Sequence, residues 1–169
     1  KTGVSFDKLL DTAIVHGADH ALGLTKEIPK IDVATGEALK DSSGNVVMQT
    51  RFEALKEIAK DAGVSFDRLL DNALARGAEG VDTVVGVSDV AGSKVRNIDL
   101  IKQAGERIGE MTGDKSQGLQ KALDFVLVTG KMEGVAEVAK SENMDSIKKV
   151  GETSGFGAKG AEMALDSVL

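Results

Sequence analysis

The segment GVSFDKLLDTAIVHGA, residues 3–18, recurs as GVSFDRLLDNALARGA, residues 63–78, with eleven identities in sixteen ungapped positions. A weaker ungapped self-match places RIGEMTGDKSQGLQKALD, residues 107–124, over KVGETSGFGAKGAEMALD, residues 149–166. Matches of this kind indicate internal duplication. We therefore take the recurring segment as the feature that decides the fold.

All four copies share one helical pattern. Apolar residues stand at offsets 0, 3, 4, 7 and 8, which is the core-facing stripe of an amphipathic helix. We expect each copy to form a helix that buries this stripe. The four sets are Phe6, Leu9, Leu10, Ala13 and Ile14; Phe66, Leu69, Leu70, Ala73 and Leu74; Leu119, Ala122, Leu123, Val126 and Leu127; and Ala161, Ala164, Leu165, Val168 and Leu169.

Two further residues recur with the stripe. An Asp follows its third residue in every copy, and a Gly lies three residues beyond it in three copies. A row of carboxylates can serve as ligands, but basic residues three positions earlier favour a solvated flank with intrahelical ion pairs. The Gly is typical of a helix C-cap or a close-packing point. These residues are Asp11, Asp71, Asp124 and Asp166, with Lys8, Arg68 and Lys121, and Gly17, Gly77 and Gly130.

Further helices are expected before and after the stripes. The spacing of apolar residues predicts helices over Phe52–Ala62, Ile98–Met111 and Val135–Gly151, and a third helix in each unit over Val81–Val90 and Val135–Ala139. The predicted fold class is all-α, with stacked helix hairpins in about four degenerate repeats. We expect one helical-repeat domain over residues 1–169, as part of a longer chain.

One segment breaks the helical period. Residues 28–50 contain the single Pro, Pro29, and have turn chemistry at Thr35-Gly36 and around residues 42–45. Residues 30–33 and 46–50 are expected to pair as a β-hairpin, inserted at about 29–50. A two-stranded element is marginal alone, so it needs a helix or a partner to lean on. Insertions in repeat proteins often carry the working face, which makes this hairpin a candidate contact surface, but an exposed hairpin more often has no specific role, and both interpretations stay open.

Composition limits the remaining choices. The chain has a net charge of −6, with no Cys, no Trp, no Tyr and twenty Gly. Disulfide and thiol chemistry are excluded, and the acidic balance disfavours nucleic acid or an anionic membrane as partner. No apolar run approaches a membrane span, and the N-terminus is no signal peptide. We expect a soluble protein, and its compartment stays open.

Residues 55–74, LKEIAKDAGVSFDRLLDNAL, carry Ile58, Ala59 and Gly63 at positions typical of a helix-turn-helix. This segment resembles the helix-turn-helix of bacterial repressor families, a resemblance that implies DNA binding through the second helix. In that family the second helix presents polar and basic groups to the major groove. Here the matching face would present Phe66, Asp67, Leu70 and Asp71, so packing explains the shared residues better than DNA does.

Two other patterns have plainer interpretations. Gly155, Gly157 and Gly160 match the spacing of a dinucleotide-binding loop, but a helix is expected before them where that motif needs a strand. His16 and His20 stand four apart, yet zinc requires at least one more ligand. We therefore predict no metal, no cofactor and no catalytic residues, and no binding residues are singled out.

The function expected from the sequence is a non-enzymatic structural or protein-interaction module within a larger protein or assembly. Protein partners or self-association are expected, and nucleic acid is an unlikely partner. The lack of Cys, Trp and Tyr would suit a virion or secreted component that is translocated unfolded. Two alternatives stay open: a helix-turn-helix DNA-binding module, and an enzyme fragment whose acid/base site is not visible in the sequence.

Overall fold

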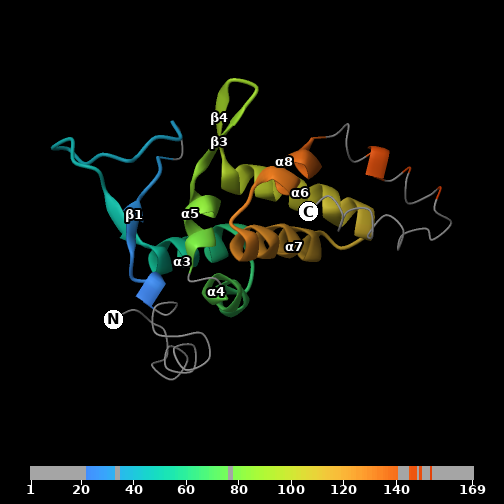
Figure 1. Cartoon of the computed structure of the whole chain (residues 1–169), viewed down its shortest axis with the longest axis horizontal. Coiled ribbons are helices and arrows are strands. Elements are labelled where there is room, and N and C mark those ends of the chain that lie inside the picture. The colour runs from blue at the N-terminus through green and yellow to red at the C-terminus, as the bar shows by residue number, and fades with distance from the viewer. Residues whose placement is uncertain are drawn as a thin grey trace.

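The computed structural model describes residues 22–32, 35–75, 78–140, 145–147, 149 and 153. This part of the chain is mainly helical and carries two small antiparallel β-sheets of two strands each (Figure 1). The predicted helical fold with a small β-hairpin is therefore confirmed as a mainly helical fold over the described residues, and the second two-stranded sheet was not predicted. Of the four stripe copies, the structure describes the second and third, so the four-repeat array stays a prediction. The first and fourth lie outside the described residues.

The predicted helix over residues 52–62 is confirmed as α3, Arg51–Ala62. It begins with a capping box, because Glu53 N–H donates to Thr50 Oγ1 while Thr50 N–H donates to Glu53 Oε2. It ends at Gly63, whose φ of 66° is the left-handed conformation that glycine adopts without strain. Its buried face includes Phe52, Leu55 and Ile58.

The second stripe forms α4, Phe66–Leu74, as predicted. Ser65 caps its first turn, and four of the five stripe residues are buried. The fifth, Phe66, is half-buried and packs edge-on against Phe52 of α3, with ring centroids 5.4 Å apart. The short turn between α3 and α4 thus folds the two helices against each other.

The third stripe forms α7, Lys115–Thr129, again with its first residue half-buried and the other four buried. Gly130 follows with a φ of 68°, which confirms the predicted C-cap role of the recurring Gly at this position. α7 packs against α4, α5 (Glu79–Val85) and α6 (Asn97–Thr112), so it lies at the centre of the described helices (Figure 1).

α6 and α7 approach so closely that glycine is required at their contact. A Cβ placed on Gly118 of α7 would lie 2.2 Å from the Gly105 carbonyl oxygen of α6. A Cβ on Gly105 would lie 2.5 Å from the Leu119 Cα. The two backbones therefore touch directly, and the helix predicted over residues 98–111 is confirmed as half of this tight pair.

The third helix predicted over residues 81–90 is wrong in its second half. α5 ends at Val85, and the chain continues as a hairpin of β3, Val87–Val90, and β4, Ser93–Arg96. Its tip, Ala91-Gly92, has positive φ at both residues, as in the type I′ turn that suits the strand twist. The side chain of buried Asn97 fastens this junction, with Nδ2 donating to the Thr83 carbonyl oxygen.

Of the two overlapping helices predicted at the end of the described region, the shorter one, over residues 135–139, is confirmed. α8 covers Glu133–Ala139 and ends at Lys140, whose backbone is extended. The prediction over residues 135–151 is therefore wrong at Lys140, and most of the rest of that range lies outside the described residues. Val135, Val138 and Ala139 of α8 are buried, against α6.

The hairpin predicted near residues 29–50 is present with different strand bounds. β1 is Glu27–Pro29 and β2 is Met48–Thr50, paired antiparallel, with isolated bridges joining Ile31 to Ala38 and Lys40 to Val46. We call the described part of residues 27–50 the ribbon. Its connection extends away from the helices in Figure 1. Hydrogen-bonded and non-hydrogen-bonded residue pairs alternate along an antiparallel ladder. Because the Lys30 N–H donates to the Val47 carbonyl oxygen, the next pair, Pro29 and Met48, is a non-hydrogen-bonded one. Pro29 therefore fits in the strand although it has no N–H to donate.

Candidate functional site

The ribbon has two different faces. Ile28 lies on the inner face and is buried, and its cross-strand partner Gln49 lies on the same face. Because side chains alternate along a strand, Pro29 and its partner Met48 occupy the outer face. Pro29 is exposed there, and Met48 is 45% exposed. The inner face thus covers the core and the outer face meets solvent.

The outer face carries an apolar patch formed by Pro29, Val46 and Met48, which we call the outer patch. Val46 stands two residues before Met48 and so on the same face, with 43% of its surface exposed. Over the described residues, the large hydrophobic side chains that are exposed are Leu22, Val46 and Met48. Residues 42–50 contain no charge, although charged residues make up 28% of the chain. An edge strand without charged residues lacks the usual protection against pairing.

A buried guanidinium attaches the ribbon to the helices. Arg51 follows β2 directly and is 3% exposed. Its Nε and Nη2 donate to the two carboxylate oxygens of Asp82 on α5, at 2.6 and 2.5 Å. Its Nη1 donates to the Gly23 carbonyl oxygen, just before β1, at 3.4 Å. One side chain therefore joins the entry to the ribbon, its exit and α5.

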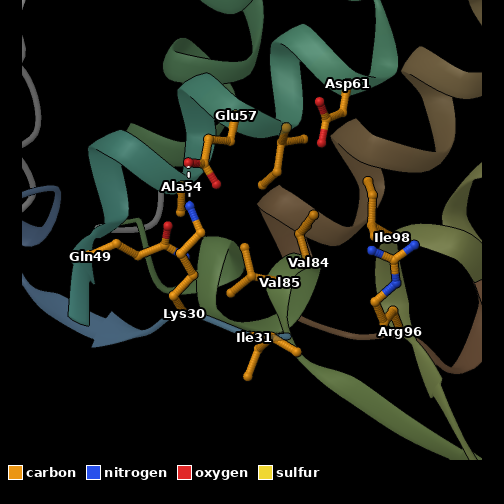
Figure 2. Close-up of a pocket in the computed structure, with 11 residues that line it drawn as sticks. Lys30, Ile31, Gln49, Ala54, Glu57, Asp61, Val84, Val85, Arg96 and Ile98 are labelled. Atoms are coloured by element: carbon orange, nitrogen blue, oxygen red, sulfur yellow. Dashed lines mark hydrogen bonds and ion pairs between the residues drawn. The ribbon is translucent and has the colours of Figure 1, made fainter. Parts of the chain in front are cut away.

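A small pocket lies between the inner face of the ribbon, α3, α5 and the start of α6. Figure 2 shows apolar side chains of α5 in its middle and polar side chains around them. The pocket encloses about 110 Å³, which suits a group of a few heavy atoms. Its walls are formed by Lys30, Ile31, Gln49, Ala54, Glu57, Ile58, Asp61, Val84, Val85, Arg96 and Ile98.

Three of the four charged groups in the pocket wall already have partners. Lys30 Nζ donates to Glu57 Oε1 at 2.6 Å, across from the ribbon to α3. The Arg96 guanidinium makes a two-pronged contact with Asp99, at 2.7 Å for each hydrogen bond. Within each pair the two charges compensate each other, so neither pair leaves an uncompensated charge for a ligand.

Two acceptors in the same wall lack partners in the part of the chain that the structure describes. The Gln49 Oε1 atom is buried and receives no hydrogen bond. Leaving such an oxygen unsatisfied costs about 1–3 kcal/mol. Asp61, on the α3 face that also carries Glu57, is exposed and makes neither an ion pair nor a hydrogen bond to the described residues. The pocket therefore offers one carboxylate and one amide oxygen to an incoming group.

The recurring Asp residues do not play one common role. Asp124 of α7 is mostly buried and accepts hydrogen bonds from Arg68 and Asn72 of α4 and from Gln120, at 2.6–2.7 Å. Arg68 of α4 thus reaches across to Asp124 of α7. Asp71 is exposed on α4. Asp124 therefore joins two helices, and of the four recurring Asp residues only Asp71 and Asp124 lie in the described part of the chain.

Several residues weighed from the sequence lie outside the described residues, so their interpretations stay predictions. They are Asp11, Asp166, Gly17, Gly77, His16, His20, Gly155, Gly157 and Gly160. Over the described residues there is no group of three His, Cys, Asp or Glu side chains that could hold a metal ion. No helix within the described ranges is long and apolar enough to cross a membrane.

The exposed surface of α4 differs from the polar and basic surface of the second helix in repressors. Its exposed positions include Asp67, Arg68 and Asp71, and the Arg68 guanidinium is occupied by Asp124. Leu70 is 1% exposed, so the apolar residues of the matching face belong to the core. A surface with two carboxylates and one engaged cation would repel the phosphates of DNA.

Comparison with models of protein families, with curated proteins and with solved structures gives no match. The functional argument therefore depends on the outer patch and the pocket themselves. Sequence reasoning had marked the hairpin as a candidate contact surface but missed Gln49 and Asp61. The uncharged run over residues 42–50 was the available signal for the outer patch, whereas nothing local marks the pocket, because its walls come from four separate segments.

Proposed function

We propose that this chain is a non-enzymatic structural or interaction module that self-associates through the outer patch of its ribbon. The observation that carries the proposal is the exposure of Val46 and Met48 at alternate positions of an uncharged segment. Apolar side chains gathered on one exposed face mark interaction sites more often than single exposed residues do.

A second copy of the chain suits this surface because of its charge. Residues 26–50 contain three Lys and four Asp or Glu, a net of −1, while the whole chain carries −6. Two copies facing each other across a two-fold axis would place Met48 near Met48 and bring no like charges together over residues 42–50. Such an isologous contact is the commonest form of self-association. The outer patch is small, so we expect a weak, reversible dimer.

The test is the oligomeric state of purified protein, measured by sedimentation equilibrium over a wide range of concentrations. Wild type should show a monomer–dimer equilibrium, and Met48→Lys should shift it at least about tenfold toward monomer, because an edge lysine must be desolvated on pairing. Ser93→Lys is the matched control: it adds the same charge at an exposed position of the other hairpin and should leave the equilibrium unchanged.

Circular dichroism of each variant checks that the fold is retained, since Met48 is exposed and its replacement removes little packing. A wild-type protein that stays monomeric at every concentration would refute self-association. Equal dimerisation of wild type and Met48→Lys would place the contact elsewhere on the molecule.

A further inference from the structure

The unsatisfied groups of the pocket lie at opposite ends of it. Figure 2 shows Gln49 on one side, next to Lys30, and Asp61 on the other, with Val84 and Val85 between them. An incoming group meets an exposed carboxylate at one end, apolar methyl groups in the middle and a buried carbonyl oxygen at the far end. This order of charge, apolar surface and acceptor specifies the chemistry of the occupant.

We propose that the pocket binds an ammonium group joined by a short apolar chain to a neutral hydrogen-bond donor. The ammonium pairs with Asp61, whose carboxylate is the acidic group in the wall that lacks a partner in the described structure. The methylene chain packs on Val84 and Val85, and the neutral donor satisfies Gln49 Oε1.

The donor at the Gln49 end is neutral because of Lys30. Gln49 and Lys30 both point from the inner face of the ribbon into the same end of the pocket (Figure 2). A second ammonium there would find no unpaired carboxylate, because Glu57 already pairs with Lys30. An amide N–H or a hydroxyl needs only the Gln49 oxygen as acceptor. Diamines are therefore disfavoured relative to ligands with one charge.

Two sources supply this chemistry: a lysine residue within a polypeptide, with its backbone N–H as donor, and a free amino alcohol. Nuclear magnetic resonance titration separates them, with Nα-acetyl-lysine methylamide and 5-amino-1-pentanol as the two probes. The methyl signals of Ala54, Val84 and Val85 report occupancy directly because these residues form the wall. The small volume leads us to expect weak binding, with a dissociation constant of order 1 mM or weaker.

Matched ligands and variants test each contact. Nα-acetyl-norleucine methylamide lacks the charge and should give at most a third of the affinity of the lysine analogue. Asp61→Asn should weaken lysine-analogue binding by about three- to fivefold, the range for an exposed ion pair. Gln49→Met should weaken both probes, and Glu110→Gln, which removes an exposed carboxylate of α6 outside the pocket, should change neither.

The outcomes are distinct. Tighter binding of the lysine analogue than of the amino alcohol assigns the pocket to a polypeptide lysine, and the reverse order assigns it to a free amine; both uphold the proposed chemistry. Equal affinity for the norleucine analogue, no binding of either probe, or an unchanged affinity in Asp61→Asn would overturn it. Repeating the titration in Met48→Lys keeps this result independent of self-association, because the outer patch faces away from the pocket.

Discussion

The α6–α7 pair and the ribbon use their residues in opposite ways. At the helix pair, Gly105 and Gly118 let two backbones touch, and four of the five stripe residues of α7 are buried. In the ribbon, Val46 and Met48 remain exposed on one face, and the Gln49 oxygen stays unsatisfied on the other. The residues of the helix pair pack against each other, whereas the ribbon leaves apolar side chains exposed and one buried oxygen without a donor among the described residues.

Breaking the helix pair should have the largest effect on stability. Gly118→Ala places a methyl group 2.2 Å from the Gly105 carbonyl oxygen and 2.5 Å from the Gly109 nitrogen, both backbone atoms that cannot move aside cheaply. We expect a loss of about 3 kcal/mol or more in the free energy of unfolding, the upper end for overpacked sites. Urea unfolding monitored by circular dichroism measures it.

The control for that variant is Gln103→Ala on the exposed side of α6. It should be neutral or slightly stabilising, because alanine is the better helix former. If Gly118→Ala is equally neutral, the two helices can move apart at no cost in stability. The claim that the α6–α7 contact requires glycine would then be wrong.

The attachment of the ribbon should come next in size. Asp82→Asn removes the charge that compensates the buried Arg51 guanidinium, which is 4% exposed as a side chain. Removing one partner of a fully buried pair costs about 3–5 kcal/mol, but Asp82 is 38% exposed, so we expect about 2 kcal/mol. Thermal unfolding measures the loss, and Glu110→Gln on α6 controls for the change in net charge. A loss no larger than that of the control would mean that Arg51 does not hold the ribbon.

The elements that the sequence predicted best are those whose signals are local. The stripes of α4 and α7 follow the helical period, and four of the five stripe residues in each helix are buried. The hairpin of β3 and β4 was missed because Ala91-Gly92 is a weaker turn signal than Asn-Gly, and because Val81, Val84 and Val85 continued the helical pattern up to Gly86.

The pocket was beyond the reach of the sequence for a physical reason. Tertiary packing places Gln49 and Asp61 in one pocket wall. Whether the Gln49 oxygen has a hydrogen-bond donor depends on the residues of α3 and α5 that pack around it. Similarly, Asp124 looked equivalent to Asp71 by register, yet the approach of α4 to α7 gives it Arg68 and Asn72 as partners. Sequence periodicity identifies which face of a helix is buried but not which partner covers it.

One substitution in the ribbon should act in the opposite direction to those above. Gln49→Met keeps the length of the side chain and removes the buried oxygen that lacks a donor, so we expect the free energy of unfolding to rise by about 1 kcal/mol. Differential scanning calorimetry measures the rise. Gln103→Met, at an exposed site, is the matched control and should change little. A destabilised Gln49→Met protein would show that the Gln49 oxygen accepts a hydrogen bond in solution and is therefore not an unsatisfied acceptor.

The smallest effect concerns the capping box between the ribbon and α3. The Thr50 N–H donates to Glu53, which is the main reason that the pKa of Glu53 lies below its usual 4.5. A carboxylate with a lowered pKa in the folded state stabilises the fold above about pH 4.5, and this contribution disappears as the pH falls through the folded-state pKa.

Glu53→Gln cannot titrate, so the difference in unfolding free energy between wild type and this variant should shrink as the pH is lowered from 7 to about 3. Asp41, whose pKa is lowered mainly by the Asn45 backbone N–H, is present in both proteins and cancels from that difference. A difference that stays constant with pH would show that the Glu53 charge contributes nothing to the cap. The start of α3 would then depend on the Thr50 hydroxyl alone, and the ribbon would be joined to the helices through Arg51 rather than through this cap.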